Sequence, residues 1–89
     1  VTGEAYQAIW RQELEKYDMA FDPAIVDHTI HALHEKYGVP MAPCHPRDLL
    51  ATAIAQLDYL GRERLLSREL LDWAWENYFV QLDENALEH

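Results

Sequence analysis

The chain is divided into four amphipathic segments by residues that start and stop helices. Asp22 followed by Pro23 is a typical N-cap with proline at the first helical position, and Ser67 is a second N-cap. Gly38 and Gly61 each follow an apolar periodic run, where glycine supplies the left-handed residue that ends a helix. These signals predict an all-α fold, a small four-helix bundle with short loops and no strand. The expected helices are residues 3–18, 23–37, 46–60 and 68–80.

Each expected helix carries apolar residues at the spacing that buries one face. The four stripes are Tyr6, Ile9, Trp10, Leu14 and Tyr17; Ile25, Val26, Thr29, Ile30, Leu33 and Tyr37; Leu49, Leu50, Ala53, Ile54, Leu57 and Leu60; and Leu70, Leu71, Ala74, Trp75, Tyr78 and Leu82. Glu13 falls within the first stripe, so we expect it to lie at the rim of the core or to meet a cation from another segment.

The composition excludes several classes of protein. The formal net charge is −9 at pH 7 over 89 residues, and so acidic a chain repels a nucleic-acid backbone. A single cysteine, Cys44, cannot form an intramolecular disulfide. No apolar run approaches the roughly 18 residues of a membrane span, and no segment has the pattern of a signal peptide. We therefore expect a cytoplasmic domain that contacts neither a membrane nor nucleic acid.

Both ends of the chain indicate an excised domain. The sequence begins at Val1 rather than at a methionine, and it ends in Leu87-Glu88-His89, which looks like the start of a vector-encoded histidine tag. We therefore expect residues 1–86 to be a single helical domain of a larger protein, and residues 87–89 to be a tag remnant that takes no part in the fold.

The start of the third expected helix is where helix rules and charge placement disagree. Cys44 or His45 would cap this helix, and Pro46 would occupy its first position. Asp48 would face the positive helix start, whereas Arg47 is a cation that opposes the helix dipole there. No carboxylate lies three or four residues from Arg47, so its partner must lie elsewhere. That partner is either a phosphate, which helix starts bind readily, or a carboxylate across the fold. The candidate carboxylates are Glu13, Glu15 and Asp58.

Other polar residues give weaker indications of chemistry. His28, His31 and Glu35 come within about 60° of one another on the solvent side of the second expected helix. They lack the further ligand of a metal centre, so we expect a solvated face and no metal site. Cys44 has no recognisable histidine–acid arrangement around it and is expected to fill a tight turn. With no phosphate-cradling glycine loop and no defined catalytic carboxylate pair, the chain is expected to perform no catalysis alone.

Trp73 and Trp75 cannot both face one small core, because they lie about 160° apart around the fourth expected helix. Trp73 forms a second stripe with Asn77 and Val80, at spacings of four and seven residues. This stripe either packs against the chain's own termini or docks on a neighbouring domain or subunit. Trp73, Asn77 and Val80 are therefore the candidate interface.

The order of the helices and the run Cys44-His45-Pro46-Arg47-Asp48-Leu49-Leu50 resemble the C-terminal helical lid domain of AAA+ ATPases. The run Leu65-Leu66-Ser67-Arg68-Glu69-Leu70-Leu71 is similar to the way many such lids enter their last helix. The resemblance covers about residues 3–80. It departs from the family at Cys44, where many members carry a glycine that lets the backbone approach the nucleotide.

This resemblance implies that Arg47 is the arginine called sensor 2, which reaches the γ-phosphate of ATP, with Pro46 and His45 beside it in the nucleotide-binding turn. ATP and its Mg²⁺ would be held by an upstream P-loop ATPase domain. The full protein would form a homo-oligomeric ring in which the lid couples ATP hydrolysis to movement. The alternative is a stand-alone helical protein–protein interaction module that uses Trp73 and needs no nucleotide. A helical DNA-binding domain would need a basic recognition helix, which neither of the last two helices offers.

Overall fold

The computed structural model describes residues 2–87, with side chains described up to Phe79. The described residues form four helices and no strand, which confirms the predicted all-α bundle. The elements are α1 (Gly3–Lys16); a second helix made of α2 (Pro23–His28), a π-helical segment η1 (Thr29–His34) and α3 (Glu35–Tyr37); α4 (Cys44–Leu60); and α5 (Arg68–Leu87). Within this part of the chain, no helix is both long and apolar enough to cross a membrane.

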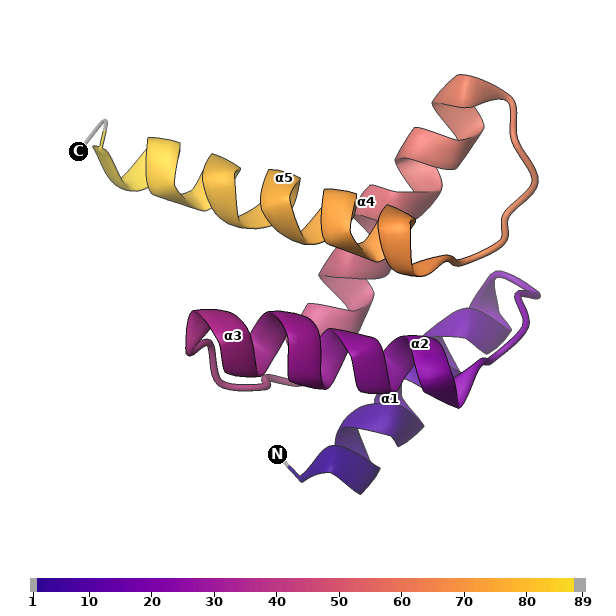
Figure 1. Ribbon diagram of the computed structural model, residues 1–89. Coiled ribbons are helices and arrows are strands. Elements are labelled where there is room, and N and C mark those ends of the chain that lie inside the picture. The colour runs from indigo at the N-terminus through magenta and orange to yellow at the C-terminus, as the bar shows by residue number, and fades with distance from the viewer. Residues whose placement is uncertain (1, 88–89) are drawn as a thin grey trace.

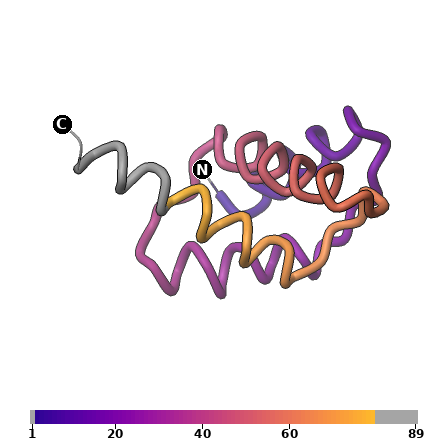
Figure 2. Tube along the Cα trace, turned by 90° about the horizontal axis from the view of Figure 1, so that it is seen from above, coloured from indigo at the N-terminus to yellow at the C-terminus, as the bar shows by residue number. Residues whose placement is uncertain are grey.

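The helices pack around one core. The second helix and α5 lie side by side, and α4 crosses behind α5 (Figure 1). Seen from above, α5 lies between α4 and the second helix (Figure 2). α4 packs against α1 as well as α5, so all four helices bury one face together. The core consists of Tyr6, Trp10, Leu14, Met19, Val26, Ile30, Leu33, Leu49, Leu50, Ile54, Leu71 and Trp75.

Three helices end in the same backbone turn. Asp18, Gly38 and Gly61 have positive φ angles of 56°, 66° and 67°. In each turn, the following residue donates its amide N–H to a carbonyl five residues earlier, which is the Schellman motif. These bonds are Met19 to Leu14 (3.0 Å), Val39 to His34 (3.0 Å) and Arg62 to Leu57 (2.9 Å). The first helix ends at Lys16 rather than at residue 18, because Asp18 itself adopts the left-handed conformation that usually requires glycine.

Two other helix boundaries differ from the prediction. α4 begins at Cys44 rather than at residue 46, because Pro43 already has helical backbone angles. α5 continues to Leu87, so the stretch Asp83-Glu84-Asn85, predicted as a polar tail, is helical. The residues after 80 include no glycine or proline and several good helix formers, so nothing in them stops the helix. The expected tag residues Glu88 and His89 lie outside the described part of the chain.

The π-helical segment changes which residues of the second helix face the core. Four members of the predicted stripe are buried or nearly so, but Tyr37 is 56% exposed and His34 is only 3% exposed. A π-helix hydrogen-bonds each residue to the one five positions along, so it turns less per residue than an α-helix. Residues after Thr29 are therefore rotated around the helix axis by less than an α-helix would rotate them. This difference turns Tyr37 toward solvent and His34 toward the core.

The remaining predicted stripes mostly face the core. Among the described side chains, the exceptions are Tyr17 and Leu60, which are 37% and 45% exposed at or just beyond helix ends, while the Leu82 side chain lies outside the described residues. The Glu13 side chain is 14% exposed at the rim of the core, where it accepts a hydrogen bond from Lys16 Nζ at 3.1 Å. The packed helices thus hold the first turn of α4 in a fixed position.

Candidate functional site

The predicted phosphate-binding arginine lies in the first turn of α4 and faces solvent. The Arg47 side chain is 65% exposed. No side chain caps this helix, which follows Pro43 directly. The amide groups of a helix start carry partial positive charge, and a guanidinium beside them adds a full one. Within this turn, however, the His45 N–H is bonded to the Ala42 carbonyl at 3.1 Å and Pro46 has no N–H, so the donors offered to an anion are mainly those of the Arg47 side chain.

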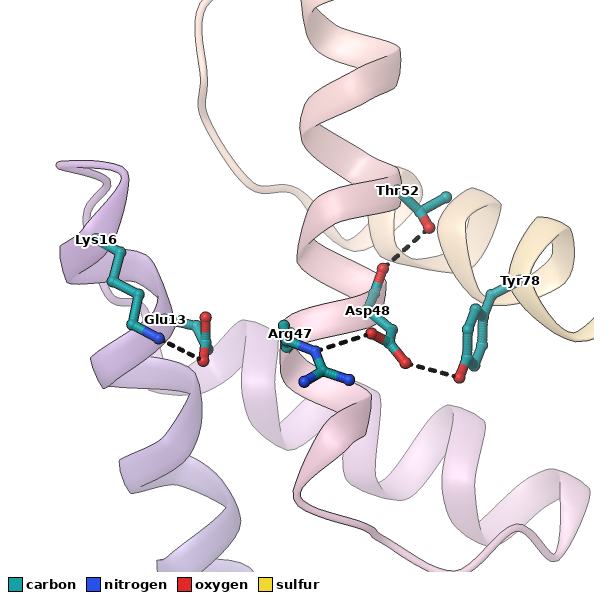
Figure 3. Close-up of polar contacts among 6 residues, drawn as sticks. All are labelled: Glu13, Lys16, Arg47, Asp48, Thr52 and Tyr78. Carbon is teal, nitrogen blue, oxygen red and sulfur yellow. Dashed lines mark hydrogen bonds and ion pairs between the residues drawn. The ribbon is translucent and has the colours of Figure 1, made fainter.

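Among the side chains that the structure describes, the carboxylate partner of Arg47 is the adjacent Asp48. Arg47 Nε donates to Asp48 Oδ1 at 3.1 Å (Figure 3). The other carboxylate oxygen, Oδ2, accepts a hydrogen bond from the Tyr78 hydroxyl on α5 at 3.0 Å. Helix spacing rules consider residues three and four apart, so they did not predict a pair of neighbours. The Asp48 side chain joins the first turn of α4 to α5.

None of the carboxylates predicted as partners from other parts of the fold bonds to the Arg47 guanidinium. Glu13 pairs with a lysine one turn along α1, although it lies across from Arg47 in Figure 3. Asp58 accepts two hydrogen bonds from Arg64, at 3.2 and 2.9 Å, and Glu15 is exposed. Among the residues whose side chains are described, the terminal nitrogens of Arg47 have no acceptor.

Arg47 and Tyr78 both hold their protons more tightly here than in water. The hydrogen bond to Asp48, together with the charge of that carboxylate, raises the pKa of the Arg47 guanidinium. Burial, followed by the hydrogen bond to Asp48, raises the pKa of the Tyr78 phenol. Both groups therefore keep their protons, and Asp48 accepts from both. The free donors of the site are the terminal N–H groups of Arg47, which suit the oxygens of a phosphate or carboxylate.

The two residues that precede Arg47 point into the protein. His45 is 9% exposed, and Pro46 is fully buried. His45 Nδ1 accepts the backbone N–H of Ala42 at 3.2 Å, and the ring packs edge-on against Phe79 with centroids 5.9 Å apart. His45 and Pro46 thus seat the first turn of α4 in the core. They hold Arg47 at the surface, where it alone of the three is open to a ligand.

A second polar network lies in the core, around His34. Its Nε2 is 2.6 Å from the Tyr6 hydroxyl, and its Nδ1 is 2.9 Å from the Val39 carbonyl oxygen. A carbonyl only accepts, so Nδ1 carries the proton and Nε2 accepts from Tyr6. Burial lowers the pKa of His34 and raises that of Tyr6. The position of His34 could not be predicted from the sequence, because only the π-helical register turns it inward and no residue marks that register.

The predicted interface residues have separate surroundings. Trp73 is half-buried and lines a surface groove of about 570 Å³ with several leucines, among them Leu57, Leu60 and Leu65. Asn77 donates its side-chain N–H to the Trp73 carbonyl at 2.8 Å, a bond within α5. The Val80 side chain lies outside the described residues. Trp73 therefore lines a surface groove together with the end of α4 and the loop that follows it.

A larger groove of about 950 Å³ lies at the surface between the second helix and α5. Tyr37 stacks on Trp75 along it, with ring centroids 6.0 Å apart. Across the groove, His28 Nε2 lies 2.8 Å from Asp72 Oδ1. His31 instead pairs with Glu35 on its own helix. The predicted polar face is thus split between two histidine–carboxylate contacts. The described residues contain no group of three or more histidine, cysteine or acidic side chains that could hold a metal ion.

Comparison with known proteins gives a family but no activity. A family model described as "Domain of unknown function (DUF8689)" matches residues 2–77. The chain belongs to this family. The matched residues cover the first three helices and the first part of α5; they include Arg47, Asp48 and Trp73, while Tyr78 lies just beyond them. No curated protein matches the chain, and no solved structure does.

Proposed function

We propose that this DUF8689 domain is the helical lid of an AAA+ ATPase, and that Arg47 contacts the terminal phosphate of ATP bound to a preceding P-loop domain. The observation that carries this proposal is the exposed guanidinium at the start of α4, whose terminal nitrogens have no acceptor among the described side chains. The order of the helices and the run of residues around Arg47 also resemble such lids.

The chemistry of the site suits this role. Charge-assisted hydrogen bonds from arginine to phosphate are short, strong and often paired. With Nε already bonded to Asp48, the two terminal nitrogens would take two oxygens of the γ-phosphate. Mg²⁺ and the remaining phosphate contacts would belong to the P-loop domain. The chain's overall negative charge disfavours anion binding by the domain alone, so we expect ATP to bind there only weakly.

The lid would turn this contact into movement. ATP would draw α4 toward the P-loop domain, and loss of the γ-phosphate would release it. Because α4 packs against both α1 and α5, a displacement of its first turn carries the body of the lid with it. In a homo-oligomeric ring, this rotation would be passed to the neighbouring subunit.

The test is Arg47→Ala in the protein that contains the P-loop domain. Loss of a donor that acts on the transferred phosphoryl group should lower ATP turnover on the order of 100-fold. Arg68→Ala is the matched control, because Arg68 is likewise an exposed arginine at a helix start, on α5. Unchanged ATP affinity and hydrolysis in Arg47→Ala would refute the proposal. Tight ATP binding by the isolated domain would also count against it.

A second candidate is a helical interaction module that uses the groove around Trp73. It is favoured by the leucines that line that groove beside Trp73, among them Leu65, which is 60% exposed. Such a module needs no nucleotide. The two candidates differ in one testable feature of the parent gene, namely whether about 200 codons before Val1 encode a strand, a G-x-x-x-x-G-K-[ST] loop and a helix.

A further inference from the structure

The Asp48 carboxylate connects two elements that are far apart in sequence. Its Oδ1 accepts from Arg47 Nε at 3.1 Å, and its Oδ2 accepts from the Tyr78 hydroxyl at 3.0 Å. The two residues bonded to Asp48 belong to α4 and α5 (Figure 3). Thr52 bonds to the backbone carbonyl of Asp48, at 2.9 Å, and so does not compete for the carboxylate.

This arrangement restricts how Arg47 can meet a ligand. A guanidinium can bind an anion either through Nε and one terminal nitrogen, or end-on through both terminal nitrogens. Asp48 occupies Nε, which leaves the end-on mode. A long side chain that is 65% exposed would otherwise sample many rotamers. One hydrogen bond at Nε, close to the middle of the side chain, removes much of that freedom.

Tyr78 in turn holds Asp48. A carboxylate cannot donate, so the tyrosine hydroxyl is the donor in this bond. The Tyr78 ring is itself fixed by the core, because it packs edge-on against Phe79 with centroids 4.9 Å apart and against His45 at 6.4 Å. The position of its hydroxyl therefore follows the position of α5. A shift of α5 along its axis would move the group that orients the Asp48 carboxylate.

We propose that Asp48 and Tyr78 are positioning residues, which aim the Arg47 guanidinium and make its orientation depend on where α5 lies. That the aimed guanidinium meets a nucleotide phosphate rests on the proposed function. The positioning itself rests on the three side chains alone. Through this link, a partner that moves α5 would change the reach of Arg47 toward its ligand, and a ligand on Arg47 would hold α5 in place.

The experiment measures the order of the Arg47 side chain by ¹⁵N relaxation of its Nε–H group. Tyr78→Phe removes one hydroxyl and changes neither charge nor packing volume appreciably. We expect the Nε–H order parameter of Arg47 to fall into the flexible range, below about 0.6, from a higher value in the unaltered protein. Arg64 is an internal reference, because its Nε bonds to Asp58 at 3.2 Å and should be unaffected.

Two controls separate positioning from a general loosening of the fold. Tyr59→Phe removes a hydroxyl from a residue that is 85% exposed, and it should leave Arg47 unchanged. Asp48→Ala deletes both hydrogen bonds from a partly exposed position and should free Arg47 as Tyr78→Phe does. This second variant also decides the matter if Tyr78→Phe fails to fold. An Arg47 order parameter that is unchanged in either folded variant would overturn the proposal.

Failure of this inference can be told apart from failure of the proposed function. If Tyr78→Phe frees Arg47 but Arg47→Ala leaves ATP turnover intact, the positioning stands and the phosphate contact is wrong. If Arg47→Ala abolishes turnover but Arg47 is equally ordered with and without the Tyr78 hydroxyl, the phosphate contact stands and the link to α5 is wrong.

Discussion

Lowering the pH from 7.5 to 5.5 should destabilise the domain, because two buried histidines would have to accept protons. His34 uses both ring nitrogens, one toward Val39 and one toward Tyr6, and His45 Nδ1 accepts a backbone N–H. Protonation of His34 would turn its acceptor nitrogen into a donor that faces the Tyr6 hydroxyl. Burial is the main cause that lowers the pKa of both histidines below the usual 6.5.

The sign and size of the effect follow from proton linkage. Histidines in the unfolded chain bind protons near pH 6.5, whereas the buried ones bind them only at lower pH. The unfolded state therefore holds more protons in this window, and stability falls as the pH drops below 6.5. A histidine that stays neutral in the fold down to pH 5.5 lowers the free energy of unfolding by up to about 1.4 kcal/mol, and two by about 2.7 kcal/mol. In a domain of this size, that upper value corresponds to a fall in the melting temperature of at most roughly 20 °C.

The assay is urea denaturation at both pH values, followed by tryptophan fluorescence. His34→Gln and His45→Gln should each reduce the difference in the free energy of unfolding between the two pH values. His31→Gln is the control, since the His31 side chain is 66% exposed and its loss should keep the steep dependence. The pKa of Asp58 is lowered by its hydrogen bond to Arg64, but the stability it contributes is lost only below about pH 3.8, outside this window. Equal stability at both pH values would refute the assignment of neutral buried histidines.

Two further changes test the core and a helix start. Leu50→Ala, at a fully buried position, should lower the free energy of unfolding by about 2 to 5 kcal/mol in the same assay. Leu65→Ala, at a position 60% exposed, should change it by less than about 0.5 kcal/mol. Similar losses in the two variants would contradict the assignment of Leu50 to the core. Asp22→Ala removes the oxygen that accepts the Ala24 N–H at 3.0 Å and should cost about 1 kcal/mol, while Asp22→Asn should retain most of that stability. Identical effects of the two Asp22 variants would exclude the cap.

The residues that start and end helices predicted the fold well. Asp22 with Pro23 places the start of the second helix correctly, and Gly38 and Gly61 place the ends of the second helix and of α4. These residues act through their own backbone preferences, which need no knowledge of the rest of the chain. Asp18 occupies the same kind of turn without being glycine, so the end of α1 could not be read from residue type.

The candidate site was predicted only in part. Arg47 stood out as a cation in the wrong place, and it is exposed at the start of α4 as that pattern suggests. Its bond to Asp48 depends on the rotamers of two neighbouring residues, and the bond from Asp48 to Tyr78 depends on how α4 and α5 cross. Tertiary geometry of this kind leaves no periodic signal. The π-helical register that buries His34 is likewise a property of packing rather than of composition.

The three Schellman turns also have a consequence for how the chain folds. Each turn closes within about six residues, so the chain reverses through bonds that form as soon as the local helix exists. The direction in which the chain leaves each of the first three helices is thereby set by bonds between residues close in sequence. Local contacts of this kind are typical of helical domains that fold fast.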